Sequence, residues 1–466
     1  MPEEPPRSSS GSSIDPKESG VAGSQPARSV SGLALAYLLH LTLPLLLLFD
    51  VVHARRLQMT LRSDLVIGGF AALWVLGAAL AYFQARDRAR FLNRIRGPLL
   101  SFYGVILALV LVEAGLRLAR RDLPPAIWRP GMRLVFKPNL TKFPGVSSVS
   151  HFRANEFGLR GPSLSSGKNV YKIVAVGAST TLCLMLDDEK TWPQQLMDIM
   201  NNRQSKLPVW VSNAGVNGHT ATHHLMMLQS LPILHAANVV LLMVGMNDFQ
   251  FTLGHGGAPT DALLAQGADQ FREEMLSGAY APYPLYRMLR IYRFFRRASD
   301  IAFERTNKED EKETLNESEL RRLRASKPAI PMPDLSIGLS EYRQRLREVA
   351  AECHQIGVRC LFLTQPSIWR PDLSSDSQSL LLFGWVGPPF QPAGHVSISD
   401  LEKGLDAYNQ IMLDVCVQTN TECLDVASVL PKNNSVFYDD VHFTEVGARL
   451  VADEIANYLL SKPPFQ

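Results

Sequence analysis

The region from about Tyr171 onward is predicted to fold as an α/β/α sandwich around a parallel β-sheet, and two observations lead to this prediction. The first is a series of short, nearly continuous apolar runs, as expected for strands buried on both faces of a sheet. These runs are Ile173–Val176, Val209–Val211, Val239–Val244, Leu361–Leu363 and Leu424–Val426. The second is that segments with helical periodicity lie between them, for example Trp192–Met200, Ser340–Ile356 and Thr444–Leu460. Such alternation is typical of a parallel sheet covered by helices on both faces.

Two long stretches interrupt this alternation, and we interpret them as insertions near residues 249–333 and 366–397. The first contains an aromatic-rich segment and a charged run, which is typical of a solvated helix face. The second is rich in Pro, Gly and aromatic residues, including Trp385 and Phe390. Insertions of this length are either functional lids or partly disordered.

The first quarter of the chain has a different composition. Residues 1–28 are rich in Pro, Ser, Gly and Glu, so we expect a disordered tail. Residues 29–118 contain three dense apolar stretches, and a helix needs about 20 apolar residues to cross a membrane. The alternative is a soluble helical bundle, but soluble helices normally keep a polar face. We therefore predict a three-span membrane anchor, then a linker or lead-in segment over 119–170 and the large domain over 171–466.

The orientation of this anchor depends on the distribution of arginines. Arginines occur on both sides of the predicted spans, and the most concentrated cluster, Arg86 to Arg96, lies between the second and third spans. Positive charge favours the cytoplasmic side of a membrane. We therefore expect an integral membrane protein whose amino terminus is cytoplasmic and whose large domain is extracytoplasmic, on the periplasmic side.

The net charge and the cysteines limit the classes of function. A formal net charge of +3 gives no argument for nucleic-acid binding, which needs a clustered basic surface. Five cysteines in 466 residues do not form a disulfide scaffold. Two pairs with equal spacing, Cys353 with Cys360 and Cys416 with Cys423, could each close a small loop in an oxidising compartment. For these two pairs we favour isolated buried thiols over disulfide bonds.

Polar residues follow three of the predicted strands. They are Ser179 in Gly-Ala-Ser-Thr-Thr, Gly218 in Asn-Ala-Gly-Val-Asn-Gly-His-Thr and Asn247 in Gly-Met-Asn-Asp. Because ligand sites of open parallel sheets lie at the carboxyl ends of the strands, these segments should converge. A fourth segment, Tyr-Asp-Asp-Val-His, precedes the last helix and contains Asp439 and His442.

These residue types suit acyl transfer through a serine nucleophile. A histidine can remove the proton of the Ser179 hydroxyl, and an aspartate three residues before His442 can orient the imidazole. Asp440 competes with Asp439 for this role, and spacing favours Asp439. Backbone N–H groups at Ser179 and Gly218 and the Asn247 amide could stabilise the oxyanion.

In this order and on these elements, the four segments resemble the SGNH (GDSL-like) hydrolase superfamily over about Tyr171 to Leu460. The resemblance implies a flavodoxin-like sandwich, a catalytic triad of Ser179, Asp439 and His442, and an oxyanion hole at Ser179, Gly218 and Asn247. The segment Asn155–Gly161 looks like the lead-in of membrane-anchored bacterial members. One departure is Ala178, where the family has an aspartate before the serine.

The predicted function is therefore a membrane-anchored serine esterase that hydrolyses an acyl ester, for example an acetyl group, on an envelope glycan or lipid. One alternative is an acyltransferase that uses the same serine, with the aromatic segment around Trp385 and Phe390 excluding water. Another is a catalytically silent domain that binds glycans or proteins. No cofactor is predicted. His219 and His223 have a spacing that can ligate zinc, but no third ligand stands out, and a structural role is favoured.

Overall fold

The computed structural model describes the chain from residue 125 onward, with gaps. The described residues are 125–165, 169–204, 206–277, 305–306, 309–387 and 392–466, with isolated helical positions between 101 and 115. Among these residues, no helix is both long and apolar enough to span a bilayer. The predicted tail of residues 1–28 and nearly all of the three predicted spans lie outside the described residues.

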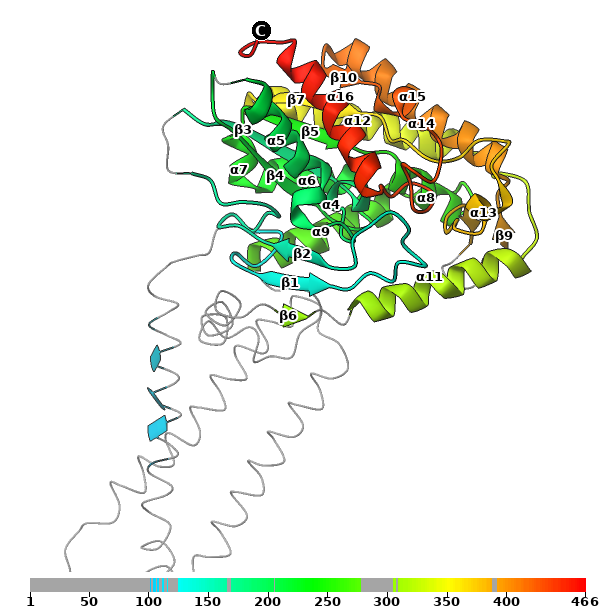
Figure 1. Ribbon diagram of the computed structural model, residues 1–466, viewed down its shortest axis with the longest axis horizontal. Helices are drawn as coiled ribbons and strands as arrows, with labels where there is room; N and C mark the ends of the chain where they lie inside the picture. Colours follow the sequence, from blue (N-terminus) through cyan, green and yellow to red (C-terminus); the bar gives the residue numbers. More distant parts are fainter. Residues whose placement is uncertain are drawn as a thin grey trace, which may run out of the picture. The chain divides into compact units, whose positions relative to one another are not determined.

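A parallel sheet of five strands forms the centre of the large domain, in the order β10-β7-β5-β3-β4 (Figure 1). The strands are β3 (Tyr171–Gly177), β4 (Val209–Gly215), β5 (Val239–Met243), β7 (Arg359–Leu363) and β10 (Glu422–Leu424). Every residue of β4 and β5 is buried, which explains the continuous apolar runs in the sequence. Numbered along the chain and read from β4, the order is 2-1-3-4-5, as in flavodoxin.

Helices cover both faces of this sheet (Figure 1). On one face α5 (Trp192–Arg203) packs against α16 (Glu445–Leu460). On the other, α12 (Ser336–Ile356) packs between α6 (Ala221–Ser230) and α14 (Ile398–Thr419). The predicted sandwich with a parallel sheet is therefore confirmed.

The predicted strand at Leu424–Val426 begins and ends earlier than expected. The observed strand is Glu422–Leu424, because the Asp425 side chain accepts a hydrogen bond from Ser428 N and caps the short helix α15 (Val426–Val429). An aspartate at a helix amino terminus competes with strand formation in this way. Two further short helices are η2 (Asp188–Lys190) and α7 (Pro232–His235).

The described part of the predicted linker folds against the sandwich. Strand β1 (Arg133–Phe136) pairs antiparallel with β2 (Ser150–Arg153) and parallel with β6 (Arg305–Thr306). Downstream, the backbone of Arg160 exchanges hydrogen bonds of 2.9 and 2.8 Å with that of Asn213 in β4. The segment is thus attached to the edge of the central sheet.

The two predicted insertions contain regular structure where they are described. The first contains α8 (Met246–Gly254), α9 (Asp261–Ser277) and α11 (Glu309–Ser326). Phe271 and Met275 of α9 belong to the main hydrophobic core. The second contains α13 (Ser375–Gln378) and a hairpin of β8 (Trp385–Val386) and β9 (Gly394–His395). Figure 1 places α11, α13 and β9 at the same end of the domain.

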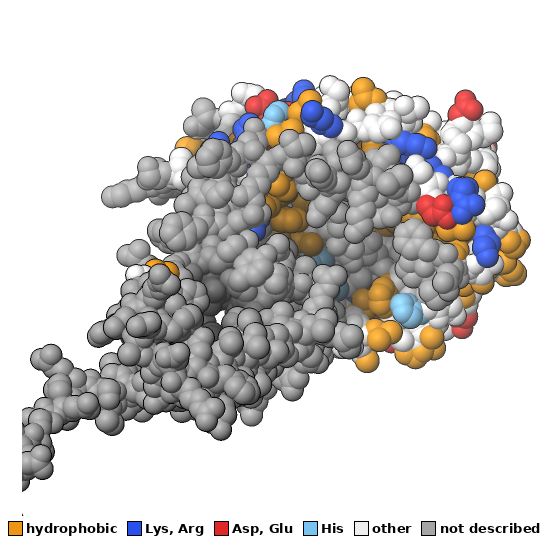
Figure 2. All heavy atoms as spheres, turned by 90° about the horizontal axis from the view of Figure 1, so that it is seen from below, with side chains coloured by type: hydrophobic (Ala, Val, Ile, Leu, Met, Phe, Trp, Pro, Cys, Tyr) orange, Lys and Arg blue, Asp and Glu red, His pale blue; other side chains and the backbone are white. Residues whose placement is uncertain are grey.

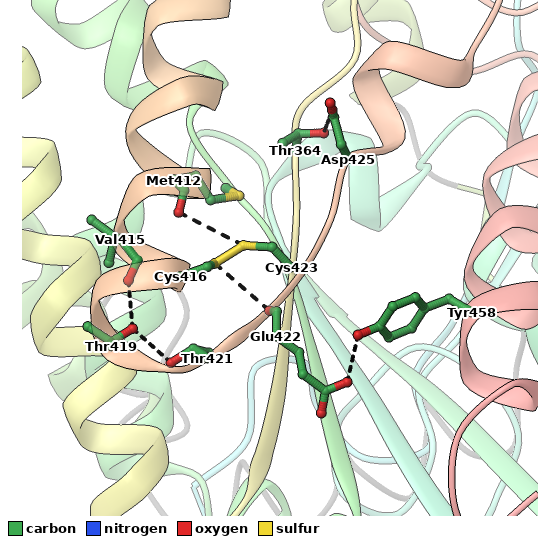
Figure 3. The surroundings of a disulfide bond; sticks show 10 residues. All are labelled: Thr364, Met412, Val415, Cys416, Thr419, Thr421, Glu422, Cys423, Asp425 and Tyr458. Carbon is green, nitrogen blue, oxygen red and sulfur yellow. Dashed lines mark hydrogen bonds between the residues drawn. A yellow bond between two sulfur atoms is a disulfide. The ribbon is translucent and has the colours of Figure 1, made fainter.

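The preference for isolated thiols is wrong for both cysteine pairs. Cys353 is bonded to Cys360 and Cys416 to Cys423, with Cα–Cα distances of 6.2 and 6.1 Å (Figure 3 shows the second). In each pair a helix ends, the chain reverses through a left-handed residue, Gly357 or Asn420, and a strand begins. This reversal brings cysteines seven residues apart within bonding reach. Cys183 is buried and free.

Candidate active site

Ser179 lies directly beyond the carboxyl end of strand β3, which pairs with β4 and β5. It is the first residue of the short helix α4 (Ser179–Leu182) and is partly exposed. Glycines beneath it allow close packing: a Cβ at Gly177 would lie 2.1 Å from Thr181 Oγ1, and one at Gly215 would lie 2.3 Å from Leu182 N. The two glycines therefore let α4 sit directly on the strand ends, with the serine hydroxyl pointing out of the sheet.

The hydroxyl of Ser179 contacts His442. The distance from His442 Nε2 to Ser179 Oγ is 2.8 Å, and that from His442 Nδ1 to Asp439 Oδ2 is 2.7 Å. The Asp439 side chain has no exposed surface, and that of His442 is 17% exposed. Since 263 positions separate Ser179 from His442 in the sequence, this contact depends on the complete fold.

The second oxygen of Asp439 is also occupied. Oδ1 accepts hydrogen bonds from the backbone N–H groups of Val441 at 3.0 Å and His442 at 2.8 Å. These bonds hold the carboxylate in a tight turn beneath the imidazole. Charge-assisted bonds of this kind fix both the position and the orientation of the histidine ring.

Asp440, the competing aspartate, has other partners. Its Oδ1 accepts the indole N–H of Trp369 at 2.8 Å, and its Oδ2 accepts backbone N–H groups of Leu382 and Phe383. The side chain is buried, and burial raises the pKa of its carboxyl. Asp440 thus attaches the 366–397 insertion to the segment that contains Asp439.

Gly218 and Asn247 come from the strands on either side of β3. Gly218 lies in the turn after β4, with φ of +76°, and no atom lies within 4 Å of a Cβ built there. Asn247 lies in the first turn of α8, after β5, and its Nδ2 donates to His219 O at 2.9 Å. Two of the three residues predicted for the oxyanion hole, Gly218 and Asn247, therefore lie in the turn after β4 and in the first turn of α8, which are directly hydrogen-bonded to each other.

Asp248 supports the same turn, a role that the sequence alone does not indicate. Both of its oxygens accept the backbone N–H of Ala221, at 3.1 and 3.2 Å. Ala221 begins α6, so this contact connects α8 to the end of the turn that contains Gly218. Burial raises the pKa of the Asp248 carboxyl to about 7. The signal in the sequence was its position directly after Asn247.

Arg160, from the lead-in segment, holds the carboxyl end of α4. It is 1% exposed, and its Nε pairs with Asp188 Oδ1 at 2.8 Å. Its two terminal nitrogens donate to four backbone carbonyls, those of Leu182 at 2.7 Å, Cys183 at 2.9 Å, His151 at 2.9 Å and Leu186 at 2.7 Å. One guanidinium therefore bonds carbonyls at the end of the serine helix and connects them to β2.

The candidate zinc ligands His219 and His223 stack face to face. Their ring centroids are 4.5 Å apart with an interplanar angle of 22°, and the edge of Phe271 packs against His219 at 4.4 Å. His223 Nδ1 lies 3.0 Å from Thr220 Oγ1. Burial lowers the pKa of His223 to about 4. In the described part of the chain, no group of three His, Cys, Asp or Glu side chains could hold a metal ion.

Comparison with known proteins identifies the family. The sequence model of the GDSL-like Lipase/Acylhydrolase family matches residues 173–450. No curated protein matches the chain. Similar solved structures include Axe2, an acetylxylan esterase from Geobacillus stearothermophilus, with 13% identity, a TM-score of 0.33, and coverage of 64% of this chain and 95% of that one.

Two further structures are similar to the same degree. The acetyl xylan esterase AlAXEase has 14% identity and a TM-score of 0.34, with 62% of this chain and 99% of that one covered. The enzyme LAE5, from the metagenome of Lake Arreo, Spain, has 13% identity and a TM-score of 0.33, with 63% and 97% covered. The family match includes Ser179, Asp439 and His442, whereas none of these comparisons supports the membrane-anchored subtype. The chain belongs to the GDSL-like lipase/acylhydrolase family and is a serine hydrolase, an esterase or acylhydrolase.

Proposed function

We propose that the protein is a membrane-anchored esterase that removes an acyl group from an ester, with Ser179 as nucleophile, His442 as general base and acid, and Asp439 as orienting carboxylate. The observation that carries the proposal is the continuous chain of contacts from Asp439 Oδ2 through His442 to Ser179 Oγ, with steps of 2.7 and 2.8 Å. This is the arrangement that activates a serine hydroxyl.

The reaction follows from these contacts. Ser179 Oγ attacks the ester carbonyl as its proton passes to His442 Nε2, and the imidazolium is stabilised by Asp439. His442 then gives the proton to the leaving alcohol, which departs from the acyl-enzyme. A water molecule attacks the acyl group, His442 accepts its proton and returns one to Ser179, and the carboxylic acid is released.

Three groups are proposed as oxyanion donors: the backbone N–H groups of Ser179 and Gly218 and the side-chain amide of Asn247. The left-handed backbone of Gly218 and the open space beside it leave room for a substrate oxygen to approach. Asn247 donates to His219 O, and an amide nitrogen carries two protons, so one remains available for the oxyanion. Each such donor contributes about 2.7–4 kcal/mol to the transition state.

An extracytoplasmic location and a membrane anchor are parts of this proposal. Disulfides persist in oxidising compartments, and the two in this domain support a position outside the cytoplasm. The support for the anchor is the three dense apolar stretches of residues 29–118, since a helix needs about 20 apolar residues to cross a membrane. An ester on an envelope glycan or lipid is the substrate that fits this location.

The contacts of the aromatic segment do not favour transfer over hydrolysis. Trp385 donates its indole N–H to Leu382 O at 2.7 Å and packs edge-on against His395. Its polar atom is therefore bonded within its own loop. Phe390 lies outside the described residues.

Hydrolysis of a simple ester tests the proposed function. The full-length protein in detergent should release nitrophenol from p-nitrophenyl acetate, and both Ser179→Ala and His442→Ala should reduce kcat by about 10³-fold or more. Adding a glycan acceptor should not divert the acetyl group from water. Equal rates for the wild type and Ser179→Ala, with both proteins folded, would refute the assignment.

A further inference from the structure

A pocket lies beside residues 381–383, the loop whose Phe383 ring packs against His442. It has a volume of about 430 Å³ and is formed between α11, α13 and the start of α14. Its polar lining includes Arg321, Arg324, His395, Ser375, Gln378 and Ser379. A pocket of this size is sufficient for a sugar ring or a small headgroup.

The charged side chains that line the pocket are arginines. Two arginines line it, and no aspartate or glutamate is among its lining residues. Burial, and then the nearby Arg324 guanidinium, lower the pKa of His395. Figure 2, which views the domain from below, shows Lys and Arg side chains beside Asp and Glu side chains at its right-hand rim, the side on which Figure 1 draws α11.

Arg324 retains hydrogen-bonding capacity in this arrangement. Its Nη1 donates to the backbone carbonyl of Phe383, which is a neutral acceptor. Among the ion pairs of the described residues, none joins Arg324 to a carboxylate within 4.0 Å, although Asp440 contributes an attraction from farther away. A guanidinium has five N–H donors, so most remain available for an anionic ligand.

The pocket is connected to the catalytic residues through a single loop. Leu381 lines the pocket, and Phe383, two residues later, packs with its ring centroid 6.0 Å from that of His442. Arg324 bonds the Phe383 carbonyl, and Asp440 bonds the Phe383 N–H at 3.2 Å. A substrate whose ester lies at Ser179 could therefore extend past Phe383 into the pocket.

We propose that this pocket binds an anionic group, a carboxylate or a phosphate, carried by the same molecule as the scissile ester. The proposal rests on the esterase function and specifies its substrate class as anionic esters. A carboxylate would come from an acidic sugar, and a phosphate from a lipid headgroup or a phosphorylated glycan. Arg324 provides the charge, and the serine hydroxyls and Gln378 can donate further hydrogen bonds.

Paired substrates test the proposal with the full-length protein in detergent. One pair is O-acetyl galacturonate and O-acetyl galactose, and the other is acetylglycerol phosphate and acetylglycerol. We expect kcat/KM to be about tenfold higher for at least one anionic ester than for its neutral partner, since hydrogen bonds to charged groups are the stronger ones. The substrate pair in which the anionic ester is preferred shows whether the anion is the carboxylate of an acidic sugar or a phosphate.

Variants of two arginines on α11 test which side chain recognises the anion. Arg324→Gln should reduce the ratio of anionic to neutral kcat/KM to near one, and Arg324→Lys should keep most of it. Arg322→Gln is the matched control, because Arg322 is 68% exposed and pairs with Glu319 instead. A ratio near one in the wild type, or an unchanged ratio in Arg324→Gln, would overturn the proposal.

A separate measurement distinguishes failure of this site from failure of the esterase. Calorimetric titration of galacturonate, galactose and glycerol phosphate into Ser179→Ala reports anion binding without catalysis. Binding of an anion that Arg324→Gln abolishes in the same background supports the pocket even if no ester is hydrolysed. Failure of both anions to bind better than galactose refutes the pocket even if the esterase is active.

Discussion

Asp440 accepts the indole N–H of Trp369 at 2.8 Å, whereas its neighbour Asp439 lies 2.7 Å from the ring of His442. Two adjacent carboxylates thus have separate partners. Asp439 belongs to the proposed catalytic chain, and Asp440 connects that chain to the 366–397 insertion.

Substitution of the two aspartates should therefore separate activity from stability. Asp439→Asn should reduce kcat on the order of 10³–10⁴-fold with little change in melting temperature, because the amide orients the imidazole wrongly. Asp440→Asn should instead reduce the free energy of unfolding by about 1–3 kcal/mol, because two or more N–H donors lose a charged acceptor. Steady-state kinetics and thermal unfolding of both variants check this. The reverse pattern would assign the orienting role to Asp440.

Replacing Arg160 should affect both stability and catalysis. Lysine cannot reproduce the fork that bonds four carbonyls around the end of α4, so Arg160→Lys should reduce the free energy of unfolding by about 2–3 kcal/mol. Because α4 begins with Ser179, kcat should fall while KM changes little. Arg153→Lys is the matched control, since Arg153 is 55% exposed and 4.0 Å from the same Asp188. Equal effects of the two variants would contradict a positioning role.

Asp248 should make stability depend on pH. Burial raises the pKa of its carboxyl to about 7 in the folded protein, whereas an aspartate in an unfolded chain titrates near 3.9. Between about pH 4 and 7 the folded state therefore holds a proton that the unfolded state has lost. The contribution of Asp248 to the unfolding free energy should fall by about 1.4 kcal/mol per pH unit across this range.

Denaturant unfolding of the wild type and Asp248→Asn at several pH values measures this contribution. The difference between the two proteins should shift in favour of the variant as the pH rises from 4 to 7, and should be constant above about pH 8. Parallel stability profiles would show that the Asp248 carboxyl does not have a raised pKa in the folded protein.

The disulfides should stabilise the domain without affecting catalysis. Each closes a short loop, with a sequence separation of seven, and loop entropy predicts about 2–3 kcal/mol for each. Both lie at the amino ends of β7 and β10, opposite the strand ends that hold Ser179. Cys353→Ser with Cys360→Ser should lower the melting temperature and leave kcat unchanged. An unchanged melting temperature after reduction would contradict the stabilising role of the bonds.

The sheet and the convergence of the candidate site residues were predictable because they depend on local patterns. Strands such as β4 and β5 are buried along their whole length, so their apolar runs are visible without any knowledge of their neighbours. Sites in parallel sheets lie at the carboxyl ends of the strands, and this rule places Ser179, Gly218 and Asn247 together at that edge of the sheet.

Other features depend on contacts between distant residues and could not be predicted. Trp369 and Asp440 are 71 positions apart, and the carbonyls bonded by Arg160 carry no signal in the sequence. The cysteine pairs had a recognisable spacing, but their bonding depends on a left-handed reversal at Gly357 and Asn420.

The most direct test of the account is whether Ser179 is an activated nucleophile. The full-length protein in detergent should react with a fluorophosphonate probe, and Ser179→Ala should not, although its thermal unfolding matches that of the wild type. Mass spectrometry of the labelled protein should place the adduct on Ser179. An unlabelled wild type that is demonstrably folded, or an adduct on another serine, would contradict the proposed mechanism.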